Sequence, residues 1–172
     1  MKRNIIIGFL FFIVFLVGCS REQTFEDFFQ QKMKELHKGE KNYSYSLVHT
    51  ELNTFHEDDA IAVFKEDKNQ GEHIFIAYFE KAENKWEWKQ TRGAEWNTPV
   101  KWSSMHKVPY IYSGTICDKS VAEVYVGDQS AKIINLEDDK RFWYAISPNE
   151  NVQVMMVKKD GTEEKIEEID HE

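Results

Sequence analysis

Residues 22–38 carry an apolar stripe with the spacing of an amphipathic helix. Its apolar residues follow one another at intervals of three, one, four and three: Phe25, Phe28, Phe29, Met33 and Leu36. One face of a helix repeats in this way. Thr24 and Asp27 fit the N-cap and N3 positions of a capping box, and Gly39 fits a helix C-cap. We expect this helix to dock on the domain's own core; the alternative is a helix that binds a partner.

After Gly39 the apolar positions alternate with a period of two, which indicates strands. Turn residues separate the segments, and Asp160-Gly161 is the clearest hairpin pair. About ten short strands behind one helix predict a mainly β fold (all-β or α+β), an antiparallel sandwich or barrel. The expected strands are 43–52, 60–65, 73–81, 85–91, 110–117, 121–126, 131–136, 141–147, 152–158 and 163–169.

Residues 73–79 (HIFIAYF) are apolar at consecutive positions, so both faces of this strand are expected to be covered. The helix is one expected cover. Residues 85–89 (KWEWK) alternate cleanly, which predicts a half-exposed strand or a strand in the outer layer of the sheet.

Residues 91–108 break the alternation and mark the best candidate for a boundary. We therefore expect a helix plus β-meander over 22–105 and a small β-sandwich-like module over 106–172, packed together on a shared core because each is small. In its strand pattern alone, the second half resembles the immunoglobulin-like β modules of secreted bacterial proteins.

The N-terminal residues have the charge and hydropathy pattern of an export signal. Lys2 and Arg3 precede an uncharged apolar segment, 5–17, that is about 20 Å long as a helix and too short for a ~30 Å bilayer core. The sequence Leu16-Val17-Gly18-Cys19 resembles the lipobox of bacterial membrane lipoproteins. The alternative is an ordinary signal anchor with a chance cysteine.

The lipobox resemblance implies a cleaved signal peptide over 1–18 and a lipidated N-terminus over 19–21. Cys19 would carry S-linked diacylglycerol, with N-acylation (such as palmitate) possible. Two fatty chains anchor a protein durably, whereas one binds only marginally. The expected location is the extracytoplasmic face of the cell membrane.

The composition argues against nucleic-acid binding and against cysteine-based frameworks. The formal net charge is −8, so a nucleic acid is not an expected partner. Two cysteines rule out a disulfide framework and a multi-cysteine metal site. Once Cys19 is lipidated, Cys117 is the remaining thiol, expected as a small buried hydrophobe rather than a reactive group.

Catalytic motifs are largely missing. Ser104 and Lys107 match S-x-x-K, but no companion motif accompanies them, so we treat the match as chance. His49 and His56 lie near the acidic run 57–59, which is either a His/carboxylate metal site or, as we prefer, a solvated turn. No catalytic residue, metal ligand or cofactor is predicted.

Aromatic residues form the one concentrated group. Tryptophan faces stack on sugar rings, and aromatic walls are common in binding pockets, but such rings also build cores. The sequence favours a core role for these aromatic rings, with a ligand-binding role as the alternative. The candidate ligand-binding residues are Trp86, Trp88, Trp96, Trp102 and Tyr112.

The expected function is therefore non-catalytic binding at the cell envelope, to cell-wall material or an exported protein. One alternative is an envelope hydrolase or its accessory subunit, with His49, His56, Glu57 and Asp58 converging in space. The other is a structural or assembly factor, which would expose an apolar patch or a free sheet edge.

Overall fold

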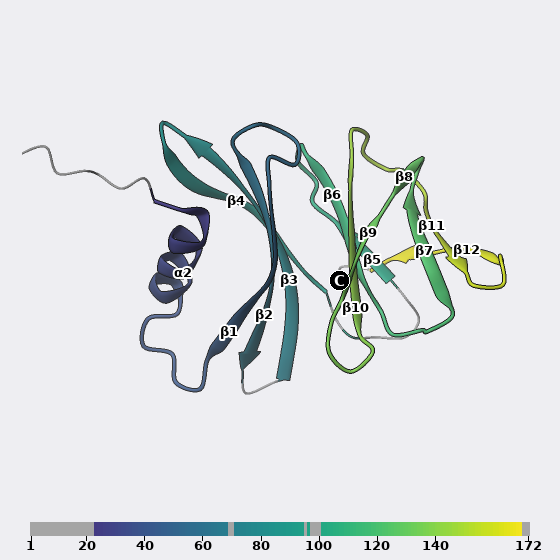
Figure 1. Cartoon of the computed structure of the whole chain (residues 1–172), viewed down its shortest axis with the longest axis horizontal. Coiled ribbons are helices and arrows are strands. Elements are labelled where there is room, and N and C mark those ends of the chain that lie inside the picture. Colours follow the sequence, from purple (N-terminus) through teal and green to yellow (C-terminus); the bar gives the residue numbers. More distant parts are fainter. Residues whose placement is uncertain (1–22, 69–70, 95, 97–100, 170–172) are drawn as a thin grey trace, which may run out of the picture.

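The structure is a computed structural model that describes residues 23–68, 71–94, 96 and 101–169. Strands hold 58% of the described residues and helix 9%, which confirms the predicted mainly β fold class. Figure 1 shows four layers stacked side by side: the helix at one end, then three sheets in succession. The predicted sandwich is thus extended by one further sheet.

The first sheet has the strand order β1-β2-β3-β4, the second β13-β5-β6-β10-β9 and the third β12-β11-β7-β8. The elements are α2 (Phe25–Leu36), β1 (Ser44–Leu52), β2 (Asp59–Lys68), β3 (Gly71–Ala82), β4 (Lys85–Ala94), β5 (Lys101–Ser104), β6 (Tyr110–Ile116), β7 (Val121–Val126), β8 (Gln129–Ser130), β9 (Lys132–Asn135), β10 (Arg141–Ser147), β11 (Val154–Lys158), β12 (Glu163–Lys165) and β13 (Glu167–Glu168).

Helix α2 begins where the sequence predicts. Thr24 is its N-cap, and the Thr24 hydroxyl accepts a hydrogen bond from the Asp27 backbone N–H at 3.1 Å. Phe25, Phe29 and Met33 are buried against the first sheet, so the expected docking on the domain's own core is confirmed. The helix ends at Leu36, a little before the predicted limit of residue 38.

The first sheet is apolar on both faces because alternate residues of each strand point to opposite sides. In β2, Ala62 and Phe64 pack toward the helix, whereas Ile61 and Val63 pack toward the second sheet. Strand β3 repeats the pattern, which confirms the expectation that residues 73–79 are covered on both sides.

The second sheet is likewise covered on both faces. In β10, Phe142 and Tyr144 join the core shared with the first sheet, and Trp143 and Ala145 join the core shared with the third. Both inner sheets therefore lie between apolar layers, and the buried side chains of the described residues form three separate hydrophobic clusters.

Strand β5 lies inside the segment for which no strand was predicted. Its four residues, KWSS, are too short to show an alternating pattern. It pairs antiparallel with β6 and parallel with β13, near the far end of the chain, an exception to the expected antiparallel arrangement. The predicted division at 105/106 stays a prediction; β5 lies before that boundary and pairs within the second sheet.

No helix within the described part of the chain is long and apolar enough to cross a bilayer. The expected signal segment and Cys19 lie outside the described residues.

Gly114 leaves space for the indole of Trp143, and replacing Gly114 with alanine should destabilise the fold. Trp143 lies opposite it in β10. A Cβ at position 114 would lie 2.5 Å from the Lys101 carbonyl oxygen and 2.8 Å from Trp143 Nε1. We expect Gly114→Ala to lower the free energy of unfolding by about 1–3 kcal/mol, measured by urea denaturation.

Gly93→Ala is the matched control within a strand. Its added Cβ would meet the ring edge of Phe75 at 3.0 Å, and a ring moves more easily than a backbone carbonyl. The Gly93→Ala loss should be clearly smaller, and equal losses would contradict the proposed role of Gly114.

Candidate functional site

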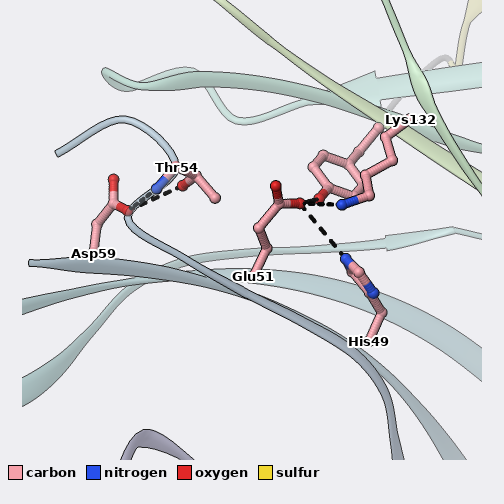
Figure 2. A network of polar contacts seen from close by, with 6 residues as sticks. His49, Glu51, Thr54, Asp59 and Lys132 are labelled. Carbon is pink, nitrogen blue, oxygen red and sulfur yellow. Dashed lines mark hydrogen bonds and ion pairs between the residues drawn. The ribbon is translucent and has the colours of Figure 1, made fainter. Parts of the chain in front are cut away.

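The turn between β1 and β2 is organised by a buried carboxylate. Asp59, fully buried, accepts backbone N–H bonds from Thr54, Phe55 and His56 at 2.6–2.8 Å. The Thr54 hydroxyl donates to the same group at 3.0 Å, as Figure 2 shows. These bonds satisfy the carboxylate's lone pairs and fix residues 53–58, which we call the Asp59 turn.

Tyr78 ties this turn to the first sheet. Its hydroxyl donates to Asp59 at 3.3 Å from the neighbouring strand β3. Burial first, and then the negative charges of Asp59 and Glu80, raise the pKa of Tyr78 well above its ordinary value. The hydroxyl thus stays a donor, and Phe55, 39% exposed, is held on a fixed support.

A second carboxylate, Glu51, joins the edge of the first sheet to the second. Its Oε2 accepts a hydrogen bond from Lys132 Nζ of β9 at 2.6 Å and another from the Tyr144 hydroxyl of β10. His49 Nε2 lies 3.6 Å from the same oxygen. Figure 2 shows Lys132 and His49 converging on Glu51. We call these four residues the Glu51 cluster.

The Glu51 cluster keeps Glu51 ionised and Tyr144 protonated. Burial acts to raise the pKa of Glu51, but hydrogen bonds from Lys132 and Tyr144 outweigh it and hold that pKa below the usual 4.5. Burial and the bond to Glu51 raise the pKa of Tyr144 far above its ordinary range. Near neutral pH the carboxylate stays charged and the phenol keeps its proton, so this pair is suited to fixed hydrogen bonding rather than proton transfer.

An open cleft of about 480 Å³ lies beside this cluster. It forms where an edge strand of each sheet meets the others: β1 of the first, β9 of the second and β8 of the third. Besides Glu51, Lys132 and Tyr144, its walls include Asn53, Phe55, Gln129, Ser130, Ile146 and Pro148. The cleft combines amides and hydroxyls with the exposed ring of Phe55 and an aliphatic wall.

The five aromatic candidates from the sequence are divided among the three hydrophobic clusters. Trp86 and Trp88 pack between the first sheet and the helix, and Trp96 packs against the core between the first and second sheets. Trp102 and Tyr112 lie together between the second and third sheets, with ring centroids 5.2 Å apart. They do not form one common wall, and their ligand binding stays a prediction.

Two of these tryptophans border other clefts. Trp102 lines a cleft of about 410 Å³, where its indole N–H donates to the Ile166 carbonyl at 2.9 Å. Trp86 lines a smaller groove of about 230 Å³ beside α2. Lys140 Nζ lies 4.9 Å from the ring centre of Trp96, a cation–π contact.

The polar candidates are also separated. His56, Glu57 and Asp58 are exposed on the Asp59 turn, whereas His49 lies within β1 beside Glu51. No group of three His, Cys, Asp or Glu side chains in the described ranges could hold a metal ion. Ser104 is buried in β5, and Lys107 is exposed after it. Cys117 is partly exposed rather than fully buried.

Sequence reasoning missed the main members of the cleft. Glu51 is separated from Lys132 by 81 positions and from Tyr144 by 93, and no local spacing records such contacts. Asp59 had a usable signal: an aspartate that follows a polar turn often accepts hydrogen bonds from the turn's backbone amides.

Comparisons with protein-family models, with curated proteins and with solved structures find no match.

Asp59→Asn should loosen the turn that carries Phe55. The new amide would place an N–H group against the backbone N–H donors and lose at least one of the bonds, so we expect a loss of about 2–3 kcal/mol in the free energy of unfolding. Amide hydrogen exchange at Thr54, Phe55 and His56 should accelerate. Asp58→Asn removes the exposed neighbouring charge and should change neither measurement; similar exchange in both variants would refute the role given to Asp59.

Proposed function

We propose that this chain is a lipid-anchored protein of the extracytoplasmic face of the cell membrane and that it acts by non-catalytic binding. The anchor rests on residues 1–19, with their basic start, short apolar segment and Leu16-Val17-Gly18-Cys19. Gln23, the first described residue, follows Cys19 closely, so the lipid would hold the folded domain near the bilayer surface.

The observation that carries the binding role is the cleft at the meeting of the three edge strands. Its walls are fixed before any ligand arrives: Asp59 holds the turn that bears Phe55, and Tyr144 and Lys132 hold Glu51. A site that is ordered in advance loses less conformational entropy when a ligand binds. Fixed polar groups beside an apolar wall are typical of ligand sites.

The chemistry of the cleft favours binding over hydrolysis. A general acid or base works best when its pKa lies near the operating pH. The pKa of Glu51 lies below its ordinary value and that of Tyr144 lies above it, so both move away from neutrality. The proposal therefore assigns these groups to hydrogen bonding.

Cys19→Ala tests the anchor. Because the proposed lipid attaches to the thiol of Cys19, the variant should incorporate no labelled palmitate and should keep its uncleaved signal segment. The measurement is metabolic labelling with electrophoretic mass in fractionated cells. A wild-type protein that takes up no label, or that has the same mass as the variant, would refute lipidation and favour the signal-anchor alternative.

Ser130→Trp tests the cleft. Ser130 is exposed on β8 and lines the cleft, so a large ring there should fill the site without disturbing the core. With soluble fragments of the host cell envelope as the probe, calorimetry should show binding to the wild type and a loss of about tenfold or more in the variant.

Ser44→Trp is the matched control, because Ser44 is exposed on β1 and is not among the residues that line this cleft. It should bind as the wild type does. Equal binding by Ser130→Trp would move the site elsewhere, and no binding by the wild type would refute the proposed binding of envelope material.

A further inference from the structure

We infer that the cleft beside Glu51 binds a neutral, hydroxyl-rich ligand, the sugar units of an envelope glycan, with one sugar face against Phe55. This inference rests on the proposed binding function and names its ligand class. It places the sugar site on residues outside the tryptophan-rich stretch of the sequence.

Charge balance argues for a neutral ligand. The charged residues in the cleft lining are Glu51 and Lys132, and they are already paired at 2.6 Å. An ionic ligand would therefore compete with an existing partner for either charge. The remaining polar residues in the lining carry hydroxyls or amides, including Asn53, Gln129 and Ser130.

The hydrogen-bonding groups argue for hydroxyls. The contacts from Lys132, Tyr144 and His49 all fall on Oε2 of Glu51, which leaves Oε1 of this cleft-lining residue as an acceptor. The amides of Asn53 and Gln129 each offer both donors and an acceptor. A hydroxyl group both donates and accepts, so a polyol can satisfy this mixed set, whereas an apolar ligand would leave those groups unpaired.

The apolar wall argues for a ring rather than an open-chain polyol. Phe55 is 39% exposed on the Asp59 turn, and Ile146 and Pro148 line the same cleft. A pyranose has a C–H face that can lie against such a surface while its hydroxyl edge meets the polar groups. The 480 Å³ of the cleft is within the range of small-ligand sites.

A peptide fits less well. An extended peptide commonly gains its affinity by adding a strand to an exposed sheet edge. Little strand edge faces this cleft: β8 spans only Gln129–Ser130, and β1 and β9 each contribute one residue to the lining, Glu51 and Lys132. The cleft presents side chains instead.

Selective destruction of the probe tests the ligand class. The full chain is titrated with host envelope fragments in three forms: untreated, protease-digested, and oxidised with periodate then reduced with borohydride. A zwitterionic detergent keeps the chain in solution, because a sugar-based detergent would compete for the site. Periodate cleaves vicinal diols and so opens those sugar rings that carry two adjacent free hydroxyls. We expect protease-digested fragments to bind like untreated ones and oxidised fragments to lose about tenfold or more in affinity.

Two substitutions locate the sugar. Phe55→Ala removes the ring and Gln129→Ala removes the amide, and each should weaken binding about fivefold. Leu36→Ala and Gln153→Ala are the matched controls: Leu36 is 56% exposed at the end of α2, and Gln153 lines the cleft beside Trp102. Both controls should bind as the wild type does.

The outcomes distinguish the class of ligand, the location of the site and the binding function itself. Binding that survives periodate but not protease would overturn the sugar and indicate a peptide, with the proposed binding function left standing. Periodate-sensitive binding that weakens in Gln153→Ala and not in Phe55→Ala or Gln129→Ala would place the sugar beside Trp102 and overturn this site. An absence of binding by untreated fragments would refute the proposed function itself.

Discussion

The fold depends on one constraint: two successive sheets must be apolar on both faces. A helix and three sheets can stack only if each inner layer presents hydrophobic side chains to both neighbours. Strand β3 meets this requirement with Ile74 and Ile76 on one side and Ala77 and Phe79 on the other. Strand β10 meets it in the second sheet, where consecutive aromatic residues point to opposite cores.

The same constraint explains where polar chemistry gathers. The inner faces are apolar, so hydrogen-bonding groups are left to the strand edges and the turns. Three edge strands, β1, β8 and β9, border the cleft. Tyr144 connects the apolar core to the polar edge of the sheets. Its ring belongs to the core between the first and second sheets, and its hydroxyl reaches Glu51 at the edge. The position of the site is therefore coupled to core packing.

The sequence predicts the elements well because their patterns are local. The stripe on α2, the Thr24 cap and the two-sided strand over 73–79 each follow from residues close together in the chain. Strand β5 was missed because four residues carry no readable period, and its partner β13 lies more than sixty positions away. Strand pairing of that kind is a property of topology, which no local pattern records.

The candidate site was harder to predict for a related reason. Trp86, Trp96 and Trp102 are near neighbours in sequence, yet they pack into different layers because the chain passes from the first sheet to the second between them. Conversely, Glu51 and Lys132 are distant in sequence and form one ion pair. In a layered β structure, closeness along the chain is a poor guide to which core a side chain joins.

The carboxylates of Asp59 and Glu51 have different roles at the cleft. Asp59 is fully buried and accepts five hydrogen bonds from Thr54, Phe55, His56 and Tyr78, so its bonding capacity is used in holding the turn. Glu51 lies at the surface end of its strand, with its contacts on a single oxygen. A carboxylate saturated by the protein stabilises structure, whereas one with an unused oxygen can still accept from a ligand. The difference lies in burial, which determines how many donors the chain itself brings to each group.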